Sequence, residues 1–78
     1  MRTEVICKVM GEVFGIEQTE IGDNASPGNI EQWDSLRHMS LVLALEEEFD
    51  VRFPEEDLDQ LISLQLIKLS LNQLLGKE

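Results

Sequence analysis

Apolar residues recur at helical spacing along most of the chain, and this pattern predicts an all-α fold. The clearest stretch is residues 35–49, SLRHMSLVLALEEEF, which contains no Gly or Pro and consists mainly of good helix formers. With about 3.6 residues per turn, one face of this helix carries five side chains: His38, Leu41, Val42, Leu45 and Phe49. We interpret this face as the part of the helix that packs into the core.

Two further helices are predicted, one on each side of this stretch. Residues 3–14 place apolar side chains on one face and are followed by Gly15, a favourable residue just past a helix end. Residues 64–75 follow Ser63, a favourable N-cap residue, and are followed by Gly76. These stretches are expected to be the first and last helices of the fold.

A short helix and a long loop complete the predicted architecture. Pro54 suits the start of a helix, and residues 55–61 after it predict a short one. Residues 16–33 predict a long connection, which in compact domains is usually functional or held down by buried side chains. Its expected anchors are Ile16, Ile21, Ile30 and Trp33. The expected fold is a four-helix bundle with three longer helices, one short helix and a long loop between the first two.

The helix over 35–49 also carries a second apolar stripe. Leu36, Met39 and Leu43 lie roughly opposite the core face and are edged by Glu46 and Glu47. A surface helix usually needs only one apolar face, so the second one favours a docking surface for a partner. The alternative is that the preceding loop covers Leu36 and Met39.

The last helix has an excess of apolar residues as well. Leu66 and Leu69 lie off its main apolar face. They either close the core from another angle, form a second contact surface or make a dimer seam, and the sequence does not choose among these. We expect a monomer.

Charge and length narrow the class of protein. The 78 residues suit one small domain spanning 1–78. Six basic residues against sixteen acidic ones give a net charge of −10, which argues against binding to nucleic acid and favours basic protein surfaces. No stretch reaches the length of a membrane span and no signal-peptide pattern is present, so we expect a cytoplasmic protein without membrane insertion.

Catalytic and metal-binding chemistry is poorly supported. His38 lies one turn from Ser35, but no nucleophile elbow accompanies the pair, so we expect a packed histidine and no catalytic residue. The acidic runs lack the spacing of a calcium loop, so no metal site is expected. Cys7 is the single cysteine, which excludes an internal disulfide, and we expect it to be partly exposed and without a functional role.

The most informative residues are those that open the helix over 35–49. Asp34 is a favoured N-cap and places Ser35 in the first turn, where free backbone N–H groups favour anions. A phosphate ester on Ser35 suits that position. Trp33 precedes the cap, where it can pack against a residue one turn inside the helix. We expect Trp33 to be a structural anchor; the alternative is that it contacts a bound group.

Taken together, these residues resemble the acyl carrier protein family, which includes aminoacyl and peptidyl carriers. The resemblance rests on Asp34-Ser35-Leu36 near the middle of the chain and on the helix end Leu45-Glu46-Glu47-Glu48-Phe49-Asp50. It covers essentially the whole chain. In that family the motif serine is esterified by 4′-phosphopantetheine from coenzyme A, and the thiol of this arm carries cargo as a thioester.

The resemblance implies a role for each matching residue. Ser35 would be the attachment site, and Asp34 would be the motif acid that meets the transferase. The partner-docking residues would be Leu36, Arg37, Met39, Leu43, Glu46 and Glu47. The partners would be a phosphopantetheinyl transferase and acyl-loading, condensing or acyltransferase enzymes. The expected function is a non-enzymatic acyl carrier in fatty-acid, polyketide or specialised-metabolite biosynthesis.

Some residues depart from the pattern of housekeeping fatty-acid carriers. Those carriers typically place acidic residues just after the motif, where this chain has Arg37, His38 and Ser40. Together with Trp33, this favours a free-standing carrier of a specialised pathway. It also makes Arg37 a candidate specificity residue; the alternative is that it only balances nearby acids. Two other functions remain open: an aminoacyl or peptidyl carrier, and a carrier-like interaction module that is never modified.

Overall fold

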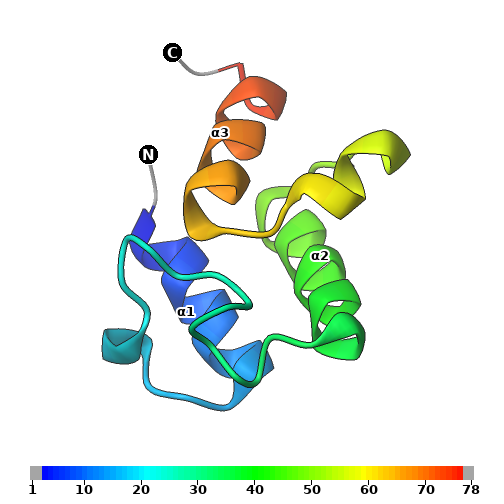
Figure 1. Cartoon of the computed structure of the whole chain (residues 1–78). Helices are drawn as coiled ribbons and strands as arrows, with labels where there is room; N and C mark the ends of the chain where they lie inside the picture. The colour runs from blue at the N-terminus through cyan, green and yellow to red at the C-terminus, as the bar shows by residue number, and fades with distance from the viewer. Residues whose placement is uncertain (1–2, 77–78) are drawn as a thin grey trace.

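Three α-helices and two 3₁₀ helices make up the computed structural model, which describes residues 3–76 (Figure 1). In chain order they are α1 (Thr3–Phe14), η1 (Gln18–Glu20), α2 (Ser35–Phe49), η2 (Glu55–Gln60) and α3 (Leu64–Leu74). The described range contains no strand, so the all-α prediction is confirmed. All four predicted helices are present; the short one is a 3₁₀ helix, and η1 is an extra turn within the long loop.

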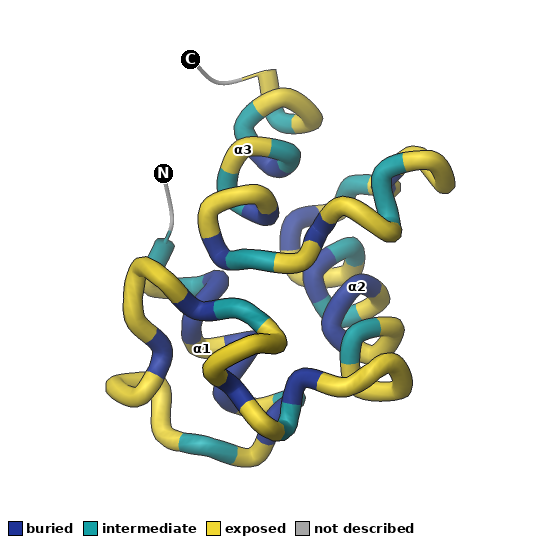
Figure 2. The backbone as a smooth tube through the Cα atoms, in the orientation of Figure 1, coloured by how far each residue is buried: buried dark blue, intermediate teal, exposed yellow. Residues whose placement is uncertain are grey.

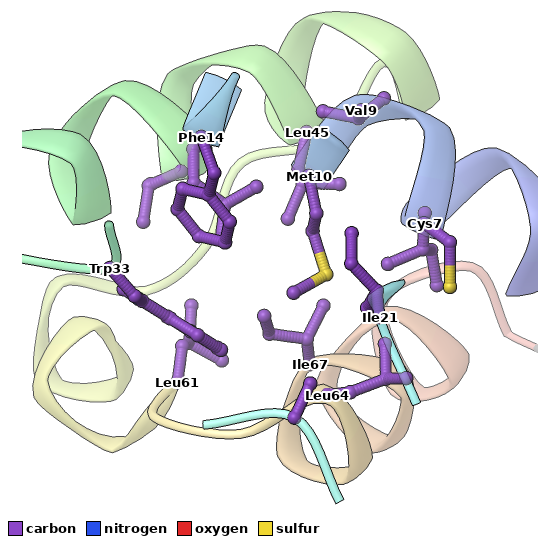
Figure 3. Packing of buried hydrophobic residues seen from close by; sticks show 14 of the residues in the cluster. Cys7, Val9, Met10, Phe14, Ile21, Trp33, Leu45, Leu61, Leu64 and Ile67 are labelled. Carbon is purple, nitrogen blue, oxygen red and sulfur yellow. The ribbon is translucent and has the colours of Figure 1, made fainter. Parts of the chain in front are cut away.

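The helices enclose one apolar core. Figure 2 shows buried segments on the inner sides of the three α-helices and a mostly exposed η2. Figure 3 shows Met10 at the centre of the labelled side chains, between Phe14 and Trp33 on one side and Cys7 and Ile21 on the other. The buried apolar residues are Ile6, Cys7, Val9, Met10, Phe14, Ile21, Ala25, Ile30, Trp33, Leu41, Val42, Leu45, Phe49, Phe53, Leu61, Leu64, Ile67 and Leu71. The predicted core face of α2 is thus confirmed.

The long loop is held down by the side chains that were expected to hold it. Ile21, Ile30 and Trp33 are buried and Ile16 is half-buried. The loop also satisfies the start of α3, because the Leu64 N–H donates to the Ala25 carbonyl oxygen over 3.0 Å. The first N–H groups of a helix have no hydrogen-bond partner within the helix. This bond satisfies one of them and fixes the loop to the start of α3.

Gly11 lets the loop pass close over α1. A Cβ atom at this position would lie 3.0 Å from the Ile16 carbonyl oxygen and 3.5 Å from the Gln18 nitrogen. Any other residue would therefore push the chain between α1 and η1 outward. Gly11 weakens α1 by about 1 kcal/mol relative to alanine, and the close approach gives that cost a structural reason.

α2 and α3 are each followed by a residue in the left-handed backbone region. Asp50 ends α2 in the left-handed region at φ 55°, and its N–H donates to the Glu46 carbonyl oxygen. Gly76, just past α3, has φ 70°, the conformation that favours glycine.

Leu66 and Leu69 of α3 are exposed, so they do not close the core. Whether they contact another chain stays a prediction.

The prediction that Cys7 is partly exposed is wrong. Only 9% of Cys7 is exposed, because α1 is covered along a wider arc than one stripe; the side chain lies near Ile21 in Figure 3. Burial raises the pKa of the Cys7 thiol, and the nearby positive charge of Lys68 opposes that rise. A higher pKa leaves less thiolate at neutral pH, and the thiolate is the reactive form.

We therefore expect the Cys7 thiol of the unmodified folded protein to react many-fold more slowly with a maleimide than the same thiol in denaturant. Because burial raises the pKa of this thiol, the rate should keep rising with pH beyond the point at which an ordinary cysteine thiol levels off. Timed labelling followed by intact-mass measurement checks this. Equal rates in the folded and unfolded states would contradict the burial of Cys7.

A pair of substitutions on α2 tests which face is the core. Phe49→Ala should lower the free energy of unfolding by about 3–5 kcal/mol, because it removes a buried aromatic ring. Leu43→Ala, on the opposite face and 63% exposed, should change it by less than about 0.5 kcal/mol. Denaturant melts followed by circular dichroism compare the two. Similar losses in both variants would mean that the outer stripe is also packed.

Candidate functional site

The first turn of α2 is built by Asp34. This residue is extended at φ −101° and ψ −177°, and its Oδ1 accepts a hydrogen bond of 2.8 Å from the Arg37 N–H. Its backbone carbonyl oxygen accepts from the His38 N–H, also over 2.8 Å. The predicted N-cap is confirmed. It makes Ser35 the first residue of α2, and Ser35 is exposed to solvent.

Arg37 folds back onto the same cap residue. Its Nη1 lies 3.0 Å from Asp34 Oδ2, and the two side chains are 47% and 52% exposed. A pair this open to water contributes at most about 1 kcal/mol to stability. Its effect is local: the guanidinium lies at the start of α2 and partly offsets the carboxylate beside Ser35. The pairing matches the reading in which Arg37 balances a nearby acid, and its role in specificity is untested.

Trp33 and His38 brace the turn from below. The Trp33 Nε1–H donates to His38 Nδ1 over 3.0 Å, and the two rings stack with centroids 6.2 Å apart. Trp33 also contacts Phe14, at a centroid distance of 5.3 Å, and is 4% exposed. Trp33 is therefore a structural anchor, as expected. Its partner one turn inside α2 is the half-buried His38.

A groove of about 490 Å³ opens beside Ser35. Its walls come from the loop, from the first turns of α2 and from the segment around η2. The lining residues are Pro27, Trp33, Asp34, Ser35, His38, Met39, Asp59 and Ile62. The sequence pattern gave no sign of Pro27, Asp59 or Ile62, because residues from distant segments meet there only through the tertiary fold.

The second apolar stripe of α2 faces solvent. Leu36 is 79% exposed, Met39 46% and Leu43 63%. The alternative that the loop covers Leu36 and Met39 is therefore wrong. Leu36 and Leu43 are mostly open to solvent, and Met39 is partly covered where it lines the groove.

The two acidic residues predicted to edge that stripe differ in their surroundings. Glu47 is exposed, whereas Glu46 is half-buried and its Oε2 accepts a 2.9 Å hydrogen bond from the Phe53 N–H. Glu46 thus also holds the chain after α2 in place, a role that its position on the helix surface did not indicate. Glu47 remains available to a partner.

Residues 3–76 offer neither a metal site nor a membrane-spanning helix. No group of three or more His, Cys, Asp or Glu side chains gathers there in a way that could hold a metal ion. None of the helices in this range has the length and apolar character needed to cross a membrane.

Comparison with known proteins connects this geometry to a family. A sequence model of the family described as phosphopantetheine attachment site matches residues 4–68, which is most of the chain. Among solved structures, the chain is similar to the solution NMR structure of holo acyl carrier protein from Geobacter metallireducens. The two are 23% identical, with a TM-score of 0.83, over 95% of this chain and 85% of that chain. At this identity the likeness shows the fold alone.

The fold and the family agree with the resemblance noted in the sequence. Members of this family carry a group for other proteins to act on, and do not catalyse its reactions. The chain therefore belongs to the phosphopantetheine attachment site family and has the fold of an acyl carrier protein: it is a carrier rather than an enzyme, and its cofactor is a covalently attached 4′-phosphopantetheine.

Proposed function

We propose that Ser35 carries the 4′-phosphopantetheine arm and that the protein presents acyl groups as thioesters on the thiol of that arm. The observation that supports this most is the position of Ser35. It is an exposed serine in the first turn of a capped helix, beside an open groove. A hydroxyl placed there is accessible to a transferase and needs no rearrangement of the core.

The residues at the start of α2 fit a phosphodiester. Free N–H groups and the helix dipole favour negative charge in this first turn. The Asp34 carboxylate already occupies the Arg37 N–H, and it is itself paired with the Arg37 guanidinium. A phosphate on Ser35 would therefore meet the positive end of α2 and a nearby cation, not a lone carboxylate.

The chain supplies only the acceptor for the attachment step. A new bond forms between the Ser35 oxygen and the phosphorus of the pantetheine phosphate of coenzyme A, while the pyrophosphate bond breaks and the nucleotide leaves. The serine proton passes to a base on the transferase. Asp34, which caps α2 next to Ser35, is the proposed contact for that enzyme.

The exposed stripe of Leu36, Met39 and Leu43 is the proposed docking surface. It is open to solvent, and Glu47 lies along its edge. With a net charge of −10, the protein should attract enzymes whose surfaces around their active sites are basic. An apolar strip with a charged edge gives fast encounters and modest affinity, which suits a carrier that must leave each enzyme. Arg37 and Glu46 are assigned smaller contributions, because each is engaged within the chain.

The proposed partners are a phosphopantetheinyl transferase and the enzymes that load, condense or transfer acyl groups. We favour a monomeric carrier in the cytoplasm, acting in fatty-acid, polyketide or specialised-metabolite biosynthesis. An aminoacyl or peptidyl carrier has the same site, because the cargo hangs on the arm. An unmodified interaction module would use the same docking surface, and the loading experiment separates it from a carrier.

Incubation with coenzyme A, magnesium and a broad-specificity transferase should add one arm to the wild-type protein. Ser35→Ala should abolish the adduct and keep the same circular dichroism spectrum, because Ser35 is exposed. Intact-mass measurement with fragment mapping reads this out, and Ser40→Ala on the same helix is the matched control. An unmodified wild type, with a known carrier modified in the same tube, would overturn the proposal.

Charge reversal along the docking surface should slow transfer. Glu47→Lys is expected to lower the rate of arm transfer at low salt by about tenfold, and added salt should shrink the difference. Glu4→Lys on α1 makes the same change of net charge at another exposed position and is the control. Equal losses in the two variants would assign the effect to net charge alone and argue against this surface.

A further inference from the structure

The only tryptophan and the only histidine of this chain meet at the base of the attachment site, and a backbone carbonyl completes the group. Trp33 Nε1 lies 3.0 Å from His38 Nδ1, and His38 Nε2 lies 3.0 Å from the Leu58 carbonyl oxygen. The three residues come from the loop, α2 and η2. We call this group the clasp.

Hydrogen-bond chemistry fixes the protonation state of the histidine. An indole N–H only donates, so His38 Nδ1 must accept and carries no proton. A carbonyl oxygen only accepts, so His38 Nε2 must carry the proton and donate to Leu58. Of the three forms of an imidazole, only the neutral ring with its proton on Nε2 satisfies both bonds.

The clasp joins the two walls of the groove beside Ser35. Trp33 is anchored in the core and directly precedes Asp34 and Ser35. Leu58 belongs to η2, whose Asp59 lines the groove opposite the first turn of α2. His38 lines the same groove and is hydrogen-bonded to both sides. The position of η2 relative to Ser35 is thus tied to one side chain.

We propose that His38 is a positioning residue of the attachment site: its neutral ring joins η2 to the turn that carries Ser35, and protonation of the ring breaks the bond to Trp33, so that η2 is no longer tied to that turn. The importance for arm transfer rests on the proposed role of Ser35. A second proton on the ring would sit on Nδ1 and face the Trp33 N–H, so that bond cannot persist.

Once the ring is protonated, the charged groups around it favour its movement away from Trp33 and toward the open groove. The Asp34 carboxylate, at the start of α2, and the Asp59 carboxylate, on η2, line the same groove as His38. Arg37, the nearest cation in sequence, is engaged by Asp34. A positive imidazolium would therefore find carboxylates on the open side of the groove in exchange for one lost hydrogen bond, to Trp33, while its Nε2–H can still donate to Leu58.

The first test is the tautomer. In ¹⁵N NMR spectra of the unmodified protein at neutral pH, the single histidine should show a proton on Nε2 and an unprotonated Nδ1. As the pH falls, the Trp33 Nε1–H signal and the amide signals of 55–60 should shift together with the histidine, while Leu71 in the core should not. A neutral ring with its proton on Nδ1, or η2 signals that ignore the histidine, would overturn the clasp.

Two substitutions each keep half of the clasp. His38→Asn places an acceptor near Trp33 but does not reach Leu58, and His38→Gln places a donor near Leu58 but leaves the Trp33 N–H without its acceptor. Both should lose the pH-dependent change in tryptophan fluorescence that the wild type shows when imidazolium forms beside the indole. A variant that kept this change would contradict the assignment of the signal to His38.

Arm transfer then separates positioning from mere folding. The transferase has its own pH dependence, so the rate for wild type is divided by the rate for His38→Gln at each pH. We expect this ratio to fall several-fold as the pH is lowered through the range in which the tryptophan fluorescence changes. A flat ratio would overturn the positioning role. If no arm is ever attached to Ser35, the proposed function fails, while the tautomer and the η2 signals still decide the clasp.

Discussion

The structure depends on how the first turn of α2 is held. In the proposed function the N-terminus of α2 presents a small hydroxyl to an enzyme, so it has to be exposed and yet rigid. The Asp34 side chain accepts a hydrogen bond from the Arg37 N–H. Trp33, the residue before Asp34, is buried in the core between Phe14 and His38. Ser35 is exposed but stands on a fixed turn, which is the condition for presenting a tethered arm to several partners.

Acidic residues are distributed unevenly along the chain. The sixteen acidic residues lie outside the segment 61–76, so the apolar stripe of α2 lies in an acidic part of the chain and the exposed face of α3 does not. On α2, Glu47 is exposed and open to a basic partner, whereas Glu46 already accepts a hydrogen bond from the Phe53 N–H. Leu66 and Leu69 on α3 have no acidic neighbours in that segment and are not suited to the same basic partners.

Helices and core faces followed from the sequence because they depend on local periodicity. The stop at Gly15, the caps at Asp34 and Ser63 and the inner face of α2 are each set by residues within one or two turns. The buried Cys7 and the close pass over Gly11 did not follow, because both depend on where the long loop and α3 lie over α1.

The candidate site divides in the same way. Asp34, Ser35 and the exposed stripe were accessible from the pattern of one helix, and Trp33 from its place before the cap. The place of Leu58, Asp59 and Ile62 at the site was not, because the segment 58–62 reaches the first turn of α2 only through the tertiary fold. The partner of His38 is a backbone carbonyl, which no side-chain pattern can reveal.

In the proposed function, a phosphodiester on Ser35 sits at the N-terminus of α2 without rearranging the core. Comparison of backbone amide NMR spectra before and after attachment of the arm tests this most directly. We expect the largest shifts in the first turn of α2, smaller ones at Asp59 and Ile62 across the groove, and unchanged signals for Leu45 and Leu71. Shifts that spread through the core, or that centre on the exposed face of α3, would contradict it.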